Sequence, residues 1–308
     1  MKIVALAGGT GAAKLLRGLA PLVDPAELTI VGNTGDDTEM WGLHISPDLD
    51  TVCYTLAGLI DERKGWGLRD ETFHALEQMP RLGEPAWFGL GDRDLATHLH
   101  RTRLLREGRS LTAATADIVA ALEVPARVLP MSDQAVRTRI LGPDGWISFQ
   151  EYFVREKAQT DVRAVAYAGA AHSAPAPGVL TAIAEARAVI VCPSNPITSV
   201  GPILAVPGIA AALAATRATV LAVSPIIGGE AVSGPAGRLM AMAGLPVSAA
   251  GVARAYAAWL DILVADERDR ALAPEIEAAG PRSAMTDTLM TGRAAETALA
   301  RHLLSLLP

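Results

Sequence analysis

The first twenty residues, MKIVALAGGTGAAKLLRGLA (residues 1–20), decide the fold. Met1–Ala7 is a nearly continuous apolar run with the length of a buried strand, and it leads into Gly8–Gly11, which contains three glycines. The apolar residues of Ala12–Ala20 then recur with helical spacing. A strand, a glycine-rich turn and a helix therefore open the chain, in the order in which phosphate-binding α/β folds begin.

A second strand and its loop extend this pattern. Leu28–Gly32 is a short apolar run, and the polar loop Asn33–Thr38 follows it directly. Strands and helices alternate again after residue 162, with predicted strands at 162–169, Ala188–Cys192, Thr219–Ser224 and Ile262–Asp266 and predicted helices at Val179–Ala186, Gly208–Ala215, Arg254–Leu260 and Ala294–Leu307. This alternation is typical of a doubly wound, mostly parallel sheet, so we expect a Rossmann-like α/β fold.

The middle of the chain departs from the alternation. Its patterns predict four helices and then a hairpin: Thr51–Leu59, Asp70–Met79, Asp94–Glu107 and Leu111–Leu122, followed by Arg137–Leu141 and Trp146–Phe153 around the turn Gly142–Gly145. No internal repeat or low-complexity linker divides the sequence. We therefore expect one domain over residues 1–308, with a helical and hairpin cap subdomain inserted at about 60–160.

Composition excludes several classes of protein. Half of the 308 residues are hydrophobic and the mean hydropathy is +0.28, which excludes a disordered chain. A net charge of −6 and an aromatic content of 4% argue against nucleic acid as a partner. Cys53 and Cys192 are too few for a disulfide framework, and proline and glycine interrupt the longest apolar tract, Ile203–Ala215. We therefore expect a cytoplasmic protein without a membrane segment.

The glycine-rich turn matches neither of the common nucleotide-binding fingerprints. A dinucleotide fingerprint would require glycine in place of Lys14 and an acidic residue in place of Asn33, and a Walker loop would require different glycine spacing. A glycine turn before a helix still suits a phosphate, because backbone N–H groups and the lysine attract negative charge. The candidate phosphate ligands are Gly9, Thr10, Gly11 and Lys14, and the alternative is a tight turn without a ligand.

Two further loops follow predicted strands and combine small polar residues with proline or glycine: PSNPITS at 193–199 and PIIGGEAVSGPAG at 225–237. Hydroxyls, amides and free backbone N–H groups bind phosphates and base edges without steric bulk. Because such loops meet at one edge of a parallel sheet, the three together indicate a long, nucleotide-like ligand. Taken singly, each loop is also compatible with an ordinary turn.

Acidic residues form the second candidate feature. Asp36 and Asp37 follow the second strand, and Asp48 and Asp50 lie within the segment SPDLDT. Carboxylates beside a phosphate site are typical ligands of Mg2+, which takes oxygen ligands and also bridges phosphate oxygens. The alternative is that Asp37 and Asp50 only cap helices.

The remaining reactive side chains give weaker indications. Arg93, in the loop GDRD, could bind an anion or a polar ring, or form a solvated ion pair. His98 and His100 are two residues apart on a predicted helix and therefore face different directions, which makes them a poor metal-binding pair. No serine or cysteine stands in a nucleophile motif, so the sequence does not support covalent catalysis.

The chain resembles the 2-phospho-L-lactate transferase family of deazaflavin coenzyme F-420 biosynthesis over nearly its whole length. The motifs that carry the resemblance are GGTG with KLL at Gly8–Leu16, SPDLDT at Ser46–Thr51, LGDRDLATH at Leu90–His98, LPMSD at Leu129–Asp133, PSNPITSVGPI at Pro193–Ile203, SPIIGG and VSGPAG within Ser224–Gly237, DERDRA at Asp266–Ala271 and DTLMT at Asp287–Thr291. Several long motifs in the same order are far more specific than one glycine loop.

The resemblance implies a Rossmann-like fold and a Mg2+-dependent transferase. A guanosine diphosphate-linked three-carbon phosphoacid would give its phosphoryl ester to the ribityl hydroxyl of the deazaflavin Fo, with release of GMP. Phosphoryl transfer requires positioning and charge neutralisation rather than a covalent nucleophile, which agrees with the residues described above. Both substrates are small molecules, and a homodimer is an oligomeric state that the sequence leaves open.

The resemblance also implies roles for individual residues. Asp50 and Arg93 would be catalytic and bind the acceptor, together with Asn33 and Thr34. Mg2+ would be held by Asp36, Asp37 and Asp50. The donor nucleotide and its phosphates would contact residues of all three polar loops, namely Gly9, Thr10, Gly11, Lys14, Ser194, Asn195, Ser224 and Gly228.

Two other functions are alternatives. Similar non-catalytic proteins of the gluconeogenesis-factor type share the GGTG opening and bind nucleotide-sugars to regulate metabolism, but the segments LGDRD and DERDRA favour the transferase. A nicotinamide-dependent dehydrogenase has less support, because Lys14 and Asn33 depart from the dinucleotide fingerprint.

Overall fold

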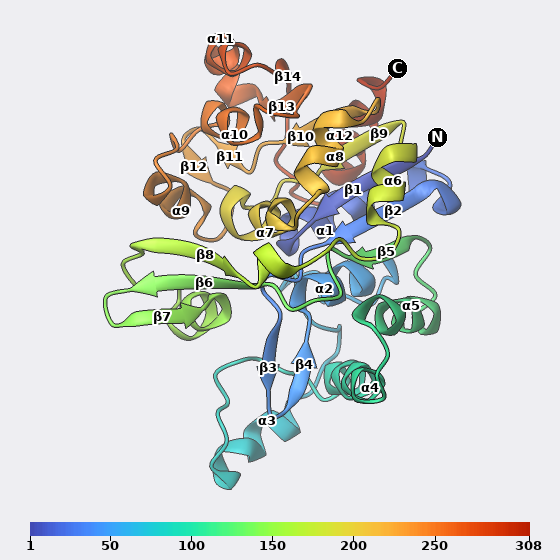
Figure 1. Cartoon of the computed structure of the whole chain (residues 1–308), viewed down its shortest axis with the longest axis vertical. Coiled ribbons are helices and arrows are strands. Elements are labelled where there is room, and N and C mark those ends of the chain that lie inside the picture. Colours follow the sequence, from blue (N-terminus) through green and yellow to red (C-terminus); the bar gives the residue numbers. More distant parts are fainter.

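A seven-stranded parallel sheet forms the centre of the molecule in the computed structural model, which describes all 308 residues (Figure 1). Its strand order is β14-β13-β10-β9-β1-β2-β5, so the chain builds outward from β1 in both directions. This is the order of a doubly wound Rossmann sheet with one added strand, and the predicted fold class is confirmed. The strands are β1 Ile3–Ala7, β2 Leu28–Gly32, β5 Arg127–Pro130, β9 Ala188–Val191, β10 Thr219–Val223, β13 Ile262–Asp266 and β14 Arg282–Thr286.

Helices cover both faces of the sheet because its strands are apolar on both sides. In β1, Ile3 and Ala5 face one core and Val4 and Leu6 face the other. The first face is covered by α1 Gly9–Leu19, α2 Pro47–Leu56, α5 Leu111–Ala121 and α12 Arg293–Ser305. The second face is covered by α6 Val179–Glu185, α7 Gly201–Ala205, α8 Ile209–Ala215, α10 Ala249–Tyr256 and α11 Ala273–Ala278.

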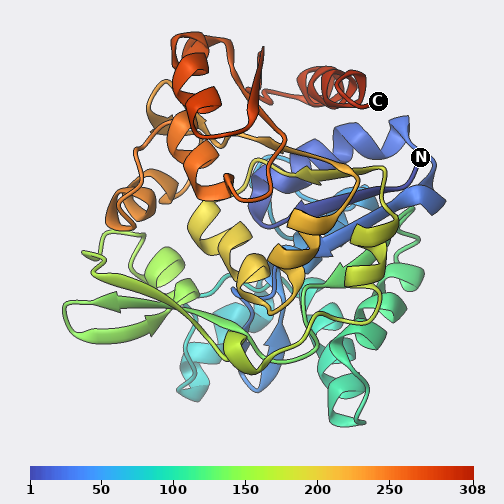
Figure 2. The same ribbon diagram turned by 45° about the horizontal axis from the view of Figure 1, so that its top comes forward.

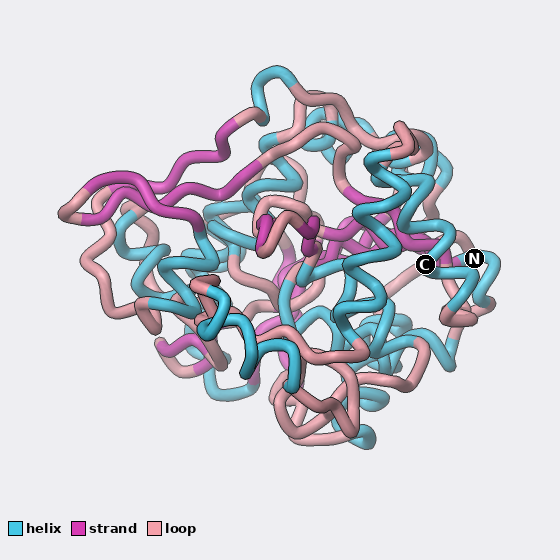
Figure 3. Tube along the Cα trace, turned by 90° about the horizontal axis from the view of Figure 1, so that it is seen from below, coloured by secondary structure: helices cyan, strands magenta, loops and turns pink.

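Two separate excursions leave the sheet, where the sequence predicted one continuous cap at about 60–160. The first, between β2 and β5, contains β3 Thr38–Met40, β4 Leu43–Ile45, α3 His74–Gln78 and α4 Asp94–Arg106. The second is an antiparallel sheet of β6 Arg137–Gly142, β7 Gly145–Ser148 and β8 Ala164–Ala168, which projects to one side in Figures 1 and 3. The prediction needs this correction because β5 pairs in parallel with β2 and therefore belongs to the central sheet.

Several predicted boundaries also change. The helix predicted at Thr51–Leu59 begins at Pro47, so Asp48 and Asp50 lie inside it rather than ahead of it. The predicted helix at Asp70–Met79 shrinks to His74–Gln78 with a 3-10 turn after it. The apolar segment at 162–169 forms β8, which pairs antiparallel with β6 and does not join the parallel sheet.

The three remaining short elements follow β10: strands β11 Ile226–Ile227 and β12 Glu230–Ala231, and helix α9 Ala236–Met242. No single helix is long and apolar enough to span a membrane. The segments Pro196–Ala205 and Ile209–Ala215 pass that test only together, and they are bent by 88° relative to each other. Ile203 and Ile209 of this pair are fully buried in the core of the sheet.

An internal ion pair fastens the last helix to the first, which lie side by side near the two termini in Figure 2. Arg17 of α1 donates to both carboxylate oxygens of Glu296 in α12, one of them at 2.7 Å from Nε. The Glu296 side chain is 1% exposed. Nη1 of Arg17 also lies 3.2 Å from Oε2 of Glu62, in the segment that follows α2. Replacing Glu296 would remove the buried partner of Arg17 and leave it only Glu62, whose side chain is 42% exposed.

We therefore expect Glu296→Ala to lower the free energy of unfolding by about 3 kcal/mol. Urea denaturation of the purified variant measures this change. Glu185→Ala is the matched control, because Glu185 pairs with Lys2 on the exposed surface and its loss should leave the transition unmoved. Equal destabilisation of the two variants would contradict a role for the internal pair.

Candidate active site

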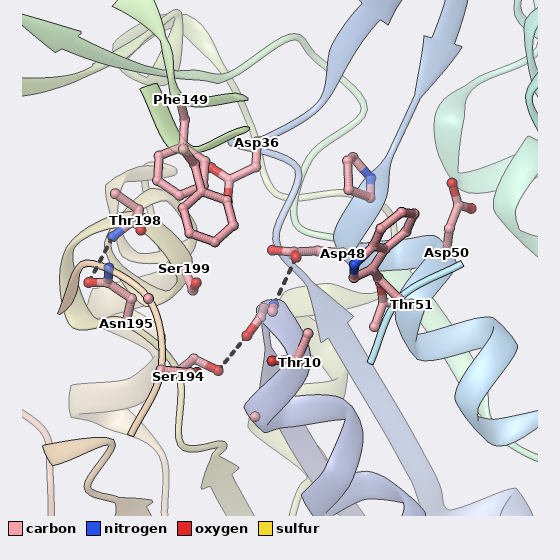
Figure 4. A pocket seen from close by; sticks show the side chains of 18 of the residues that line it. Thr10, Asp36, Asp48, Asp50, Thr51, Phe149, Ser194, Asn195, Thr198 and Ser199 are labelled. Atoms are coloured by element: carbon pink, nitrogen blue, oxygen red, sulfur yellow. Dashed lines mark hydrogen bonds between the residues drawn. The ribbon is translucent and has the colours of Figure 1, made fainter. Parts of the chain in front are cut away.

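A cleft of about 550 Å³ opens at the carboxyl ends of the central strands (Figure 4). The strands β1 and β9 are neighbours in the sheet. After β1 the chain goes to β2 on one side, and after β9 it goes to β10 on the other side, so the loops that follow β1 and β9 lead in opposite directions. Open α/β sheets bind ligands at such a switch point. Ser194 after β9 donates from its hydroxyl to the carbonyl oxygen of Gly8 after β1, at 2.7 Å, and both residues line the cleft.

The three polar loops that the sequence placed at one sheet edge all reach this cleft, which confirms their predicted convergence. The lining residues from these loops are Gly8–Gly11 and Lys14 after β1, Pro193–Asn195, Thr198 and Ser199 after β9, and Ser224, Pro225 and 232–236 after β10. Of the predicted donor ligands, only Gly228 is missing from this set. Its backbone N–H donates to the carboxylate of Asp269 at 3.1 Å and is therefore already occupied.

The start of α1 supplies a site for an anion. The helix begins at Gly9, not at Ala12 as predicted, with Gly8 as its extended N-cap. The first N–H groups of a helix have no partner within it, and the helix dipole favours negative charge there. Lys14 lies one turn further along, lines the cleft and makes no ion pair with a carboxylate. Thr10, Gly11 and Lys14 can thus bind a phosphate.

Gly8 is required by close packing. A Cβ atom at this position would lie 2.8 Å from Cβ of Ser199, 2.9 Å from Oδ2 of Asp48 and 3.1 Å from Cβ of Asn33. Cβ atoms in proteins essentially never lie within 3.0 Å of a non-bonded atom, so the first two contacts would be clashes. The glycine therefore lets the ends of β1 and β2, α2 and the loop after β9 meet at one point.

Asp48 contacts the start of α1, and Asp36 lines the same cleft (Figure 4). The carboxylate of Asp48 accepts hydrogen bonds from the Gly9 N–H at 2.8 Å and from Asn33 Nδ2 at 2.9 Å. Burial raises the pKa of Asp48 to about 6, although both hydrogen bonds act in the opposite direction. Burial and the charge of Asp48 together raise the pKa of Asp36 well above its ordinary value. Burial thus disfavours the ionised form of both carboxyl groups in the absence of a ligand.

The Asp36 and Asp48 pair fits a divalent cation. Oδ1 of Asp36 is buried and has no hydrogen-bond partner in the protein. A bound cation would satisfy this oxygen. Mg2+ is usually held by one or two carboxylates, with substrate phosphates and water as its other ligands. No three His, Cys, Asp or Glu side chains are grouped as a metal centre would require, so phosphates would have to complete the coordination.

The predicted ligand set of Asp36, Asp37 and Asp50 does not form one cluster. Oδ2 of Asp37 accepts from Ser46 Oγ and lies against Nε2 of His44, both at 2.9 Å, and Asp37 does not line the cleft. Asp50 lines the cleft, but both of its carboxylate oxygens bind the guanidinium of Arg101. Asp48, which the sequence offered as part of the acidic group but not as a ligand, takes the place beside Asp36.

Three other predicted residues lie outside the cleft. Asn33 stands behind it and orients Asp48, and Thr34 is buried next to Asn33. Arg93 is exposed, and its guanidinium donates to the carbonyl oxygen of Arg69 at 2.9 Å. In this structure Arg93 therefore fixes the loop before α4 rather than facing a ligand.

Aromatic side chains form part of the cleft that the sequence did not reveal. Trp66 and Phe88 come from the first excursion, and Phe149 and Phe153 come from the second. The rings of Phe149 and Phe153 are stacked at 5.5 Å with an angle of 7° between their planes. These residues are up to 87 positions apart in the sequence, so no local pattern could group them. Their rings suit a planar ligand.

Comparisons with known proteins place the chain among transferases. The family model described as 2-phospho-L-lactate transferase CofD matches residues 3–297. A phosphoenolpyruvate transferase of Streptomyces griseus is 45% identical over 312 residues, which cover 99% of this chain and 98% of that protein. A 2-phospho-L-lactate transferase of Methanosarcina acetivorans is 44% identical over 304 residues, with the same coverage of both chains.

The fold also occurs in a more distant solved structure. A UPF0052-family protein of Bacillus halodurans superposes with a TM-score of 0.65, covers 98% of both chains and is 17% identical. At this identity the likeness concerns the fold alone.

We expect Gly8→Ala to destabilise the protein by about 1–3 kcal/mol, because the added methyl group has to displace Ser199 or the Asp48 carboxylate. It should also weaken the affinity of the neighbouring anion site for inorganic phosphate, measured by calorimetry. Gly292→Ala is the control, since Gly292 has an extended backbone and no atom within 4 Å of the new Cβ. Unchanged stability and phosphate affinity in Gly8→Ala would show that this packing is not needed.

The raised pKa of Asp48 predicts a pH-dependent stability. Between about pH 4, the pKa of an unfolded aspartate, and pH 6, the folded state binds more protons than the unfolded state, so the contribution of Asp48 to stability falls as the pH rises. We therefore expect the melting temperature of Asp48→Asn, relative to the wild type in chelator, to be higher at pH 7.5 than at pH 4. A relative melting temperature that does not change with pH would contradict the assignment.

Proposed function

Because this chain belongs to the 2-phospho-L-lactate transferase family, we propose that it moves a phosphorylated three-carbon acid from a guanosine diphosphate-linked donor to the ribityl hydroxyl of the deazaflavin Fo. The products are GMP and coenzyme F-420-0 or its dehydro form. The whole-length identity to transferases supports this reaction over the regulatory, non-catalytic alternative.

The observation that carries the proposal is an anion site next to a pair of carboxylates in the middle of the cleft. Asp48 touches the start of α1 and lies between Asn195 on one side and Asp50 on the other (Figure 4). A donor can therefore bind along one half of the cleft and an acceptor along the other, with the diphosphate where they meet. The polar loops after β9 and β10 favour the first half for the nucleotide.

Mg2+ is the cofactor that this arrangement fits best. Asp36 and Asp48 would hold it, and it would supply positive charge to the phosphate oxygens of the donor. The pair alone is a poor site for two anions at neutral pH, since burial disfavours both ionised forms and the charge of Asp48 further disfavours that of Asp36. A cation together with a phosphate ligand removes this conflict.

The chain's own residues bind and orient the reacting groups. The N–H groups of Thr10 and Gly11 and the ammonium group of Lys14 bind the donor phosphates, whereas the Gly9 N–H already donates to Asp48. Asn33 keeps the Asp48 carboxylate in place. The oxygen of the acceptor hydroxyl then forms the new bond to phosphorus while the bond to the GMP phosphate breaks, and the hydroxyl proton is released. Such transfer depends on alignment and charge, and it needs no covalent nucleophile.

Competition between donors can identify which three-carbon acids the enzyme transfers. Relatives of similar identity are named for phosphoenolpyruvate and for phospholactate, so similarity does not choose between them. Phospholactate, phosphoenolpyruvate and phosphoglycerate differ by a methyl group, a double bond or a hydroxyl. Since an apolar pocket discriminates such differences by only about 1–3 kcal/mol, we propose that the enzyme accepts more than one of them.

Mixing the protein with Fo, the three guanylylated donors and Mg2+ tests the proposal. Mass spectrometry should detect GMP and more than one phosphoacid ester of Fo, and excess chelator should abolish both. Lys14→Gln should lower kcat/KM by about a hundredfold, whereas Lys2→Gln, on the exposed surface, should not change it. No product from any donor would refute the transferase, and full activity in chelator would refute the role of Mg2+.

A further inference from the structure

Lysine side chains are scarce in the cleft, and the proposed reaction uses only one of the two that it contains. Lys14 belongs to the anion site, whereas Lys64 comes from the first excursion. No arginine lines the cleft, and its aspartates outnumber its lysines. The positive charge of Lys64 therefore stands in a largely acidic surface, where an anionic group of a ligand would be its natural partner.

A tight turn after α2 holds the backbone at Lys64 in place. Oδ1 of Asp61 accepts hydrogen bonds from the backbone N–H groups of Arg63 at 3.0 Å and of Lys64 at 3.3 Å. The carbonyl oxygen of Asp61 accepts a further hydrogen bond from the Gly65 N–H at 2.8 Å. Gly65 has a φ of +76°, a conformation that favours glycine. We call residues 61–67 the Lys64 turn.

The ammonium group of Lys64 lies over two aromatic rings. Nζ is 5.4 Å from the centroid of the Trp66 ring and 4.9 Å from that of Phe73. The Trp66 ring packs closely on the backbone of Gly89, where a Cβ atom would lie 2.9 Å from its Cη2. Oδ2 of Asp61 is 3.8 Å from Nζ, which is too far for a hydrogen bond. The rings thus orient the ammonium group and leave its N–H donors for a ligand.

The Lys64 turn packs against the start of α1. A Cβ atom at Gly65 would lie 3.5 Å from Cγ2 of Thr10, at ordinary van der Waals distance. Thr10 is the second residue of α1 and lines the cleft at the anion site. The residue next to Lys64 therefore touches the anion site, so a group attached to a bound phosphate comes within range of the long lysine side chain.

The proposed donor carries an anionic group that the anion site does not use. Its diphosphate is bound by the start of α1, Lys14 and Mg2+. Its three-carbon acid adds a carboxylate, which phospholactate, phosphoenolpyruvate and phosphoglycerate have in common. An ammonium group and a carboxylate form a charge-assisted hydrogen bond, which is stronger than a bond between neutral groups. Lys64 is the remaining lysine of the cleft that can form it.

We propose that Lys64 binds the carboxylate of the three-carbon acid and thereby makes the donor site specific for acids. This inference rests on the proposed function and deepens it. A lysine is a point charge on a flexible stem, so it tolerates the small differences in carboxylate position among the three acids. The same residue therefore accepts several acids and disfavours a donor in which the carboxylate is missing.

The test compares two guanosine diphosphate esters, one of lactate and one of 2-propanol, in which a methyl group replaces the carboxylate. Calorimetry with Mg2+ and without acceptor measures their affinities for the wild type, Lys64→Gln and Lys64→Arg. The wild type should bind the lactate ester at least tenfold more tightly, the effect of one hydrogen bond between charged groups. Lys64→Gln should lower this preference to about threefold or less and bind the 2-propyl ester unchanged, whereas Lys64→Arg should retain most of it.

Arg63→Gln is the matched control. Arg63 precedes Lys64 in the same turn and has the same charge, but its side chain is 94% exposed and does not line the cleft. Its loss should leave the preference unchanged, which separates a local contact from a general loss of positive charge. Lys14→Gln should weaken both esters by the same factor, because they share the diphosphate. Melting temperatures show which variants are folded, and Lys64→Met, which keeps the apolar stem, replaces Lys64→Gln if that variant is unfolded.

The outcomes separate the inference from the proposed function. An unchanged preference in folded Lys64→Gln overturns the inference, since another group would then bind the carboxylate. An equal loss of affinity for both esters also overturns it and assigns Lys64 to the diphosphate. A wild type that binds both esters equally overturns it too, and release of GMP from the lactate ester on addition of Fo then leaves the transferase standing. A wild type that binds neither ester and releases no GMP refutes the proposed function, and the inference falls with it.

Discussion

The hydrogen bond from the Gly9 N–H to the Asp48 carboxylate is the interaction on which the site depends. It fastens the start of α1 to α2, and Asn33 at the end of β2 binds the other oxygen of the same carboxylate. Gly8 makes this possible, because any side chain there would collide with Asp48 and Ser199. One carboxylate thus sets the positions of two helices and a strand end, and it places a negative charge beside the site that attracts an anion.

Such a site is electrostatically unfavourable when it stands alone. Burial raises the pKa of both Asp36 and Asp48, the charge of Asp48 raises that of Asp36 further, and Oδ1 of Asp36 lacks a partner. The two apolar cores of the sheet contain neither aspartate, and their burial offsets the free-energy cost of burying these carboxyl groups. Perturbed carboxylates of this kind are typical of functional sites, where a ligand supplies the missing charge. Here a cation and a phosphate together would do so.

The central sheet and the two excursions contribute different things to the cleft. The sheet places the start of α1, Lys14 and the polar loops after β9 and β10 at its edge. The excursions bring in the aromatic rings, with Trp66 from one and Phe149 from the other, and the first also brings α4 with its buried charges. Phosphate chemistry is thus tied to the Rossmann core, whereas the features that suit particular substrates come from the insertions.

The sequence by itself determined the α/β class, the strand, turn and helix at its start and the meeting of three polar loops, because hydrophobic periodicity and the succession of elements along the chain are written in local sequence. Only the tertiary structure decided which carboxylates act together. Asp48 contacts Gly9 across 39 positions and Asp50 contacts Arg101 across 51. Helix α2 begins four residues earlier than predicted, so both aspartates lie within a helix rather than ahead of it. The strands β5 and β14 and the antiparallel pairing of β8 also escaped prediction, since short or half-polar strands are defined by the neighbours they pair with. Side-chain direction and long-range contact arise only when the chain has folded.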